Sequence, residues 1–461
     1  MTFPSERSLE VLVKRSHFSP PTTRQSRWII ALSQPSSCRG YDRAMPYPPL
    51  PSLRQQAALR DAWLGQRLEA LVPAIMRRHD IEAWVLVARE YNEDPVVATM
   101  LPATWLSARR RTILVFTDHG DTRAAIARYP VDGLFPAEWD PDVQPDQWAA
   151  LAEHLDAADP ATIALNVSEA FPLADGLSHH EWEAMMRALP ERLRPRAVSA
   201  ESLAIGWLET RLPVETEALA DACRTAHELL RRGLSAEAIV PGSTTTRDLE
   251  WWLRDETRSA GLDVWFHPAA SVQRADGDQS GNFAADPNDD AITAGDLIHV
   301  DFGIVRLGLH TDQQEHAYVL RPGETDVPSG LRQGMANANR VQDLLMAEFK
   351  TGRSGNDVLR SALVAARAQS LDATIYTHAL GLHGHAAGPT IGLWDRQDGV
   401  PGPGDYPLYP DTAYSIELSV GRPVAEWDGQ VVRFMVEEDA FFDGTHVGFL
   451  DGRQTEIWRI G

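Results

Sequence analysis

The stretch VDFGIVRLGLHTDQQ, residues 300–314, limits the fold more than any other, because it places two carboxylates within apolar strand sequence. Asp301 and Asp312 lie eleven positions apart, with a predicted turn between them. If this turn is centred between Arg306 and Leu307, the two aspartates face each other across a hairpin. Opposed like charges destabilise a strand pair, and apolar neighbours predict burial. A cation bound between the carboxylates would offset both costs. The alternative is a solvated hairpin with two harmless aspartates.

The composition is that of an enzyme-sized chain with two domains. Its 461 residues exceed one average core, and its 43 basic against 65 acidic residues argue against nucleic acid as a partner, because phosphate binding uses clustered Lys and Arg. No apolar run approaches the roughly 20 residues of a membrane span, so we expect no membrane partner. The two cysteines, Cys38 and Cys223, are far apart in sequence, which favours a reducing compartment and a cytoplasmic location.

The first 44 residues differ from the rest of the chain. They carry seven Lys or Arg against three Asp or Glu, and this net charge of +4 leaves −26 for the remainder. They are rich in Ser, Pro and Arg, and their longest apolar run, WIIAL at 28–32, is shorter than the roughly 7 to 15 residues of a secretory signal core. We interpret residues 1–44 as a disordered or artefactual tail, since Met45 opens the sequence that looks like a domain. A transit-type targeting segment is the alternative.

Helix and strand patterns divide the remaining chain into two parts. Residues 45–210 mix helical and strand periodicity and predict an α/β domain without a catalytic constellation. Residues 211–461 alternate helices with antiparallel strands, which predicts an α+β catalytic domain. We expect helices at 55–78, 179–189, 214–232, 244–261, 329–350 and 356–371, and strands at 81–88, 110–118, 161–168, 297–305, 309–320, 413–420, 431–442 and 456–460.

Three further groups add to the aspartate pair. The Gly-rich stretch YTHALGLHGHAAGP holds His378, His383 and His385, and it suits side chains that converge on a site because it cannot form a regular helix. In TAYSIELSV the alternation puts Glu417 opposite the apolar face. In VVRFMVEEDAFF it puts Glu438 with an apolar stripe, where a carboxylate is costly without a partner. Two Asp, one His and two Glu suit a pair of divalent ions such as Mn²⁺, Co²⁺ or Zn²⁺.

This ordered set resembles the pita-bread metallopeptidases, a family that includes Xaa-Pro dipeptidase (prolidase), aminopeptidase P and methionine aminopeptidase. The family's first ligand hairpin has the form DxG…GxxxD, which Asp301 and Asp312 match at the usual spacing. Its His ligand is followed seven positions later by a second, substrate-side His, which His378 and His385 match.

The end of the chain completes the resemblance. The family's last ligands lie on two late strands, where Glu417 and Glu438 match. The resemblance is close from about residue 213 to the C terminus, and the preceding region is similar to the creatinase-type N-terminal domain. It therefore implies an α/β creatinase-like N-terminal domain, residues 45–210, followed by an α+β pita-bread catalytic domain, residues 211–461.

The resemblance also implies an activity and the residues that perform it. Two divalent ions per subunit, first of all Mn²⁺ and otherwise Co²⁺ or Zn²⁺, would be held by Asp301, Asp312, His378, Glu417 and Glu438. Glu417 would in addition take the proton of the attacking water, and His385 would bind the substrate's carbonyl or tetrahedral oxygen. The implied substrates are short peptides, with preference for Xaa-Pro bonds, and both dipeptidase and aminopeptidase activity stay open. Related prolidases also imply a homodimer.

The substrate-binding positions depart from the family pattern. Asn282 stands where the family has a proton-shuttling His, so we expect it to bind substrate without carrying a proton. Thr374 replaces a His of aminopeptidase P, and Val436 replaces an Arg two residues before the last Glu ligand, with Arg433 displaced. Five other histidines could substitute functionally: His267, His299, His310, His316 and His383.

Two other functions stay open on the sequence alone. One is a creatinase-like C–N hydrolase that works without metal, and the other is a catalytically silent binding protein of the same fold. Members of the first kind lose the carboxylate ligands, which this chain retains. The second would keep buried carboxylates without a metal, which is energetically expensive.

Overall fold

The computed structural model describes residues 47–275 and 291–461, and Met45–Gly461 form one compact unit. Our predictions for the tail at 1–44 and for Asn282 lie outside the described residues. Within the described ranges, none of the helices combines the length and the apolar character that crossing a bilayer requires.

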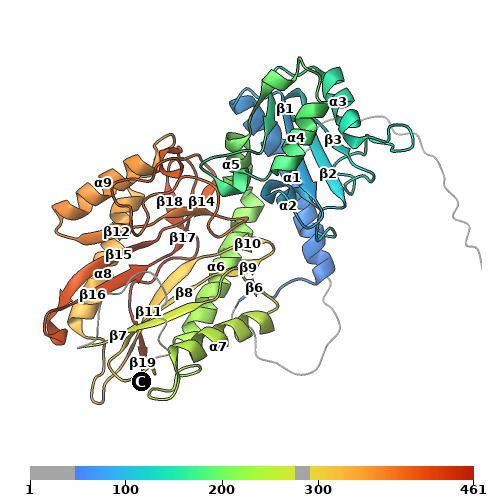
Figure 1. Cartoon of the computed structure of the whole chain (residues 1–461). Helices are drawn as coiled ribbons and strands as arrows, with labels where there is room; N and C mark the ends of the chain where they lie inside the picture. The colour runs from blue at the N-terminus through green and yellow to red at the C-terminus, as the bar shows by residue number, and fades with distance from the viewer. Residues whose placement is uncertain (1–46, 276–290) are drawn as a thin grey trace, which may run out of the picture. The chain divides into compact units, whose positions relative to one another are not determined.

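A five-stranded mixed sheet with the order β3-β2-β1-β4-β5 organises the first part of the described chain (Figure 1). Its strands are β1 (Ala83–Arg89), β2 (Arg111–Thr117), β3 (Thr122–Ile126), β4 (Ile163–Leu165) and β5 (Ala197–Ser199). Its helices are α1 (Leu53–Arg78), α2 (Pro95–Met100), α3 (Gln147–Ala158), α4 (His179–Ala188) and α5 (Glu201–Glu209). Trp84 and Leu86 of β1 pack into one apolar cluster and Val85 and Val87 into another. Both faces of β1 are therefore buried, as its continuous apolar run predicts.

The second part of the described chain begins with a helix at Pro213. Helix α6 (Pro213–Gly233) starts at a proline, which suits the first helical position, and α7 (Thr246–Ser259) starts after the capping residue Thr245. Helix α6 packs on strands β8 to β11, and α7 packs on β6 and β7 (Figure 1). These strands are β6 (Asp263–Val264), β7 (Ala269–Gln273), β8 (Leu297–Phe302), β9 (Ile304–Arg306), β10 (Leu309–His310) and β11 (Gln313–Val319). The sheet β19-β11-β8-β7 also takes in the last strand, β19 (Trp458–Ile460).

The rest of the chain forms two sheets, and three segments of the chain each run from a strand of one sheet into a strand of the other. Helices α8 (Ser329–Met346) and α9 (Gly355–Ala368) cover the sheet β12-β15-β16, and the second sheet is β13-β14-β17-β18. The strands are β12 (Asp372–Ile375), β13 (His378–Leu380), β14 (Thr412–Ser415), β15 (Leu418–Val424), β16 (Gln430–Val436), β17 (Asp439–Phe442) and β18 (Val447–Phe449). The chain passes between the two sheets at three two-residue breaks, 376–377, 416–417 and 437–438.

The predicted helices are confirmed to within four residues at each end, but four predicted strands are wrong in one respect. Each of them, 297–305, 309–320, 413–420 and 431–442, is interrupted, at 303, 311–312, 416–417 and 437–438. Short elements such as α2, β3 and β12 were not predicted at all. The interruptions matter because candidate ligands lie at three of them.

The predicted register of the 300–314 hairpin is also wrong. Leu307 and Gly308 both have positive φ, 54° and 82°, as a tight two-residue hairpin turn requires. The turn is therefore centred between these two residues, and Asp301 pairs with Gln314 rather than with Asp312. The break at 311–312 between β10 and β11 nevertheless lets the Asp312 side chain reach Asp301.

Candidate metal-binding active site

Five side chains with ligand atoms gather where the strands break. They are Asp301 on β8, Asp312 between β10 and β11, His378 at the start of β13, Glu417 between β14 and β15, and Glu437 between β16 and β17. Ligand atoms of Asp301, Asp312 and Glu437 lie within 4.8 Å of one another, and so do those of His378, Glu417 and Glu437. Glu437 belongs to both groups and joins them into one cluster.

Glu438, which the sequence predicts as the last carboxylate of the set, is not part of this cluster. Its Oε2 lies 2.8 Å from His227 Nε2, and its Oε1 accepts a hydrogen bond from the Gln454 backbone N–H at 2.7 Å. Glu437 takes the place that we expected for Glu438. The premise that a buried Glu438 needs a partner is correct, but the partner is an imidazole on the distant helix α6. The residue two positions before the fifth carboxylate is consequently Met435 rather than Val436.

Two buried atoms of the cluster have no hydrogen-bond partner, Asp301 Oδ1 and His378 Nε2. His378 Nδ1 donates to the Ala379 carbonyl oxygen at 3.0 Å, which leaves the lone pair on Nε2. This Nε2 lies 3.7 Å from both Asp312 Oδ2 and Glu437 Oε1. Both unpartnered atoms are thus free to bind a cation within the cluster.

The electrostatics of the cluster have the same consequence. Burial raises the pKa of Asp301, Asp312 and Glu417 well above the ordinary carboxyl range, and the nearby Glu437 raises each of them further. Crowded carboxylates in a low-dielectric interior resist ionisation because each charge repels the next. A bound divalent cation would reverse this effect, since it offsets the charges and satisfies the unpartnered atoms.

Gln314 and Asp439 hold the cluster in place, although the sequence did not single out either residue. Gln314 Nε2 donates to Glu417 Oε1 at 2.9 Å and to Glu437 Oε2 at 2.6 Å, so one amide spaces two carboxylates. The Asp439 carboxylate accepts the backbone N–H of Asp312 at 3.2 Å. The place of Gln314 two residues after Asp312 was the only signal that could have identified it.

His385 lies at the edge of the cluster, where its ring is within 4.8 Å of ligand atoms of Asp312 and His378, and it faces an aromatic wall. Its ring meets that of His378 edge-on, with centroids 4.7 Å apart, and meets Trp265 at 5.1 Å. Trp265 Nε1 donates to the Thr311 carbonyl oxygen at 2.8 Å, and a Cβ on Gly384 would lie 2.3 Å from the Trp265 ring. The glycine at 384 is therefore needed for this close approach, which fixes Trp265 against His385.

A cavity of about 470 Å³ opens onto the cluster. Its walls include Asp301, Asp312, Glu417 and Glu437 on the polar side. The other side consists of Trp265, Phe266, Tyr376, His385, Leu393 and Trp394. A pocket with an apolar wall and a few convergent charged groups is typical of a binding site for a small molecule that carries both polar and apolar groups.

The five alternative histidines do not line this cavity. His299 Nε2 lies 2.9 Å from Gln314 Oε1, so it touches the site only through that amide, and His316 packs against His299 with ring centroids 5.2 Å apart. His310 and His383 stack at 6.2 Å from each other, and His310 lines a different cavity. His267 packs on Trp251 at 5.1 Å.

Thr374 lies on β12, paired with Ser419, and Arg433 Nη1 donates to the Ser419 hydroxyl at 3.1 Å.

The sequence matches a known family model over the residues that line this cavity. The family model of Metallopeptidase family M24 matches residues 217–439, a span that contains all five side chains of the cluster. No curated protein matches the chain.

Solved structures share the fold at low sequence identity. An X-Pro aminopeptidase from Thermotoga maritima superposes with a TM-score of 0.59 at 16% identity, over 83% of this chain and 99% of that chain. An Xaa-Pro dipeptidase from Bacillus anthracis gives 0.59 at 14% identity, over 87% and 99%. The N-terminal domain of the FACT complex subunit SPT16 from Cicer arietinum gives 0.53 at 10% identity, over 89% and 99%. The two-part layout and the pita-bread fold of the second part are therefore confirmed.

Proposed function

Because the model of Metallopeptidase family M24 matches residues 217–439, we propose that the chain is a metal-dependent peptidase that hydrolyses short peptides, with preference for Xaa-Pro bonds. The observation that supports this most is the cluster beside the cavity, in which three carboxylates with raised pKa values lie close to Glu437 and His378. The preference for Xaa-Pro bonds rests on similar structures that are named as an X-Pro aminopeptidase and an Xaa-Pro dipeptidase.

The cluster fits divalent metal ions. We propose that Asp301, Asp312, His378, Glu417 and Glu437 hold two such ions, with Mn²⁺ as the first candidate and Co²⁺ or Zn²⁺ as alternatives, since carboxylate oxygens with one imidazole suit these metals. The unpartnered Asp301 Oδ1 and His378 Nε2 support this assignment. When bound, such ions supply Lewis-acid polarisation of the scissile carbonyl and lower the pKa of the attacking water.

Two side chains of the site are suited to the remaining steps. The Glu417 carboxylate would accept the proton of the attacking water, and the hydrogen bond from Gln314 to its Oε1 fixes its orientation. Burial and the neighbouring His378 lower the pKa of His385 to about 4, so its ring is neutral near pH 7 and carries one N–H. That N–H would donate to the substrate's carbonyl oxygen as it gains negative charge.

The cavity walls favour an apolar residue next to the scissile bond. Trp265, Phe266, Tyr376 and Trp394 offer flat apolar surfaces against which a pyrrolidine ring can pack. Among the described residues that line the cavity, none is Lys or Arg. The free carboxylate of a dipeptide would therefore meet no cationic side chain there, and we expect peptides that extend beyond the proline to be accepted as well as dipeptides.

A small peptide panel tests the proposal. Hydrolysis of Ala-Pro, Ala-Pro-Ala, Ala-Pro amide and Ala-Ala would be measured after chelation and after addition of Mn²⁺. We expect cleavage of the Ala-Pro bond only with metal, faster than cleavage of Ala-Ala, and of similar rate in the tripeptide and the dipeptide. Equal cleavage of Ala-Ala would remove the proline preference without affecting the metallopeptidase assignment.

The same panel separates the two other functions. A creatinase-like hydrolase would not respond to chelation, and hydrolysis at full rate by metal-free protein would support it. A silent binding protein would cleave none of the peptides under any condition. The likeness to SPT16 shows that this fold also occurs in a chain named as the subunit of a complex rather than as a peptidase.

A further inference from the structure

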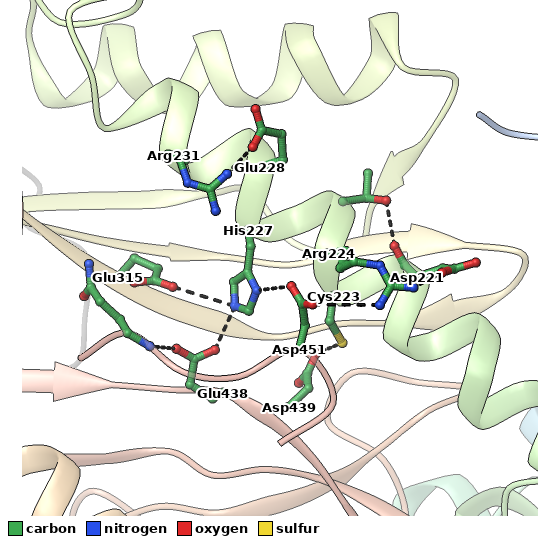
Figure 2. A network of polar contacts seen from close by, with 12 residues as sticks. Asp221, Cys223, Arg224, His227, Glu228, Arg231, Glu315, Glu438, Asp439 and Asp451 are labelled. Atoms are coloured by element: carbon green, nitrogen blue, oxygen red, sulfur yellow. Dashed lines mark hydrogen bonds and ion pairs between the residues drawn. The ribbon is translucent and has the colours of Figure 1, made fainter. Parts of the chain in front are cut away.

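Three consecutive acidic residues, two at the break between β16 and β17 and one at the start of β17, point to three different places. Glu437 joins the catalytic cluster, and Asp439 binds the Asp312 backbone and lies 3.3 Å from the Cys223 thiol. Glu438 instead points toward helix α6, where it meets His227 (Figure 2). The surroundings of Glu438 form a second cluster that the proposed peptidase reaction does not use.

This second cluster contains one imidazole and two carboxylates from separate elements. His227 Nε2 on α6 lies 2.8 Å from Glu438 Oε2 and 3.7 Å from Glu315 Oε1 on β11. All three side chains are buried, and their ligand atoms lie within 4.8 Å of one another. Figure 2 shows His227 pointing from its helix toward both carboxylates.

Asp451 orients the imidazole from the opposite side. Its Oδ2 lies 2.8 Å from His227 Nδ1, so the carboxylate accepts the Nδ1–H and leaves Nε2 directed at Glu315 and Glu438 (Figure 2). A carboxylate that binds the second ring nitrogen is the usual companion of a metal-binding histidine, because it fixes both the tautomer and the ring orientation.

Glu315 supplies an independent sign of a missing ligand. Its side chain is 2% exposed, and its Oε2 has no hydrogen-bond partner. Burial raises its pKa well above the ordinary range, and Glu438 beside it raises the pKa further. A buried carboxylate oxygen that makes no hydrogen bond is costly unless a cation binds it.

The cluster also has an access route. A cavity of about 310 Å³ is lined by His227, Glu315 and Asp451, together with Arg231 and Arg453. Both arginines are already paired, Arg231 with Glu228 and Arg453 with Asp343. Their charges are thus largely offset, and an incoming cation would not meet two free positive groups.

We propose that His227, Glu315 and Glu438 form a second divalent-metal site, distinct from the catalytic cluster, with Asp451 as the residue that orients His227. One imidazole and two carboxylates suit Zn²⁺ or Mn²⁺. A bound ion ties α6 to β11 and to the break that carries Glu437, so it stabilises the fold around the catalytic carboxylates without touching the substrate. The assignment does not depend on the proposed peptidase activity.

The test separates the two sites by removing the catalytic one. The full chain with Asp301→Asn and Glu437→Gln would be dialysed against Mn²⁺ or Zn²⁺, and bound metal would be measured by elemental analysis together with Tm. We expect one ion per chain and a Tm that rises with the ion concentration. Adding Glu315→Gln should abolish both effects. Adding Glu456→Gln, which changes an exposed carboxylate at the mouth of the same cavity, should leave both unchanged.

Several outcomes would overturn the second site. No bound ion and no response of Tm in the catalytic-site double variant would leave the cluster as a histidine held by carboxylates. An ion that persists after Glu315→Gln would place the metal elsewhere. If the double variant fails to fold, wild type and Glu315→Gln are compared directly, and equal metal content would contradict the proposal. None of these results depends on whether the chain cleaves peptides.

Discussion

At the scale of single residues, the neighbours of His385 determine what its imidazole can do. The ring lies between His378 and Trp265, and a neutral imidazole offers one N–H donor on that side of the cavity. The carboxylates beside it cannot donate a hydrogen bond once they are ionised. We therefore propose that His385 binds the substrate oxygen that becomes negative during hydrolysis.

Replacement of His385 by alanine tests this role. We expect His385→Ala to lower kcat and kcat/KM by similar factors, about 100-fold or more, because the lost hydrogen bond strengthens in the transition state. The metal content, measured by elemental analysis, should stay as in wild type, because His385 is not one of the proposed metal ligands. His383→Ala serves as control, because His383 lies outside the candidate cavity and should change kcat by no more than a few-fold. Wild-type kcat in His385→Ala would remove the role.

At the scale of elements, the breaks between strands create the site. Residues at a break leave the ladder of their sheet, so their side chains can turn toward a shared cavity instead of alternating across a sheet face. The Gln314 backbone N–H donates to the Glu437 carbonyl oxygen at 3.0 Å, which links β11 to the break after β16. Asp312, Glu417 and Glu437 all reach the cluster from such breaks.

These breaks also explain what the sequence could and could not predict. Asp301, Asp312, His378 and Glu417 were recognised because their spacing matches a family pattern, and the structure brings them together. We predicted Glu438 rather than its neighbour Glu437 as a ligand because we assumed that strand alternation continues without a break past β16. This alternation places Glu438 on the apolar face. Alternation indicates which side chains are buried, but it does not indicate whether a buried carboxylate joins the candidate metal-binding cluster or pairs with an imidazole from another helix.

Helix α2 gives a prediction for the pH dependence of stability. Asp94 caps this helix by accepting from the backbone N–H groups of Val96 and Val97, yet burial raises its pKa to about 6. A carboxyl whose pKa is higher in the folded state holds its proton better there, so folding loses stability as the pH rises from about 4 to above 6. We expect Asp94→Asn, which keeps the cap, to be free of this loss of about 3 kcal/mol.

The measurement for Asp94 is the free energy of unfolding in urea at several pH values between 4.5 and 8. The difference between wild type and Asp94→Asn should change in favour of the variant as the pH rises, mostly below pH 7. A difference that stays constant over this range would show that Asp94 has an ordinary pKa in the folded protein.

At the scale of the whole molecule, a buried ion pair joins the N-terminal α/β part to the second part. Arg67 on α1 lies 2.8 Å from Glu215 on α6 and stacks on Trp207 at 4.4 Å. Both charged side chains are 3% exposed. The alternation of elements predicted the two parts, and the compact unit from Met45 onward shows that they pack together. Contacts such as this pair, across 148 positions of sequence, have no local signal that could reveal them.

Removal of Arg67 should destabilise the protein strongly. We expect Arg67→Met to lower the free energy of unfolding by about 3 to 5 kcal/mol, because it leaves the Glu215 charge buried without its partner. Adding Glu215→Gln should recover part of the loss. The exposed pair Arg77 and Asp121 is the matched control, and Arg77→Met should cost no more than about 1 kcal/mol. Equal effects of Arg67→Met and Arg77→Met in urea unfolding would show that the buried pair adds nothing.

We propose that the metal ions that drive peptide hydrolysis are bound by Asp301, Asp312, His378, Glu417 and Glu437. The most direct test combines equilibrium dialysis, elemental analysis and the cleavage rate of Ala-Pro-Ala for wild type and for Glu437→Gln. We expect metal-free wild type to be inactive and added Mn²⁺ to restore its activity in proportion to bound metal. Glu437→Gln should bind fewer ions and stay inactive. Full hydrolysis by metal-free wild type, or wild-type metal content and rate in Glu437→Gln, would contradict the proposal.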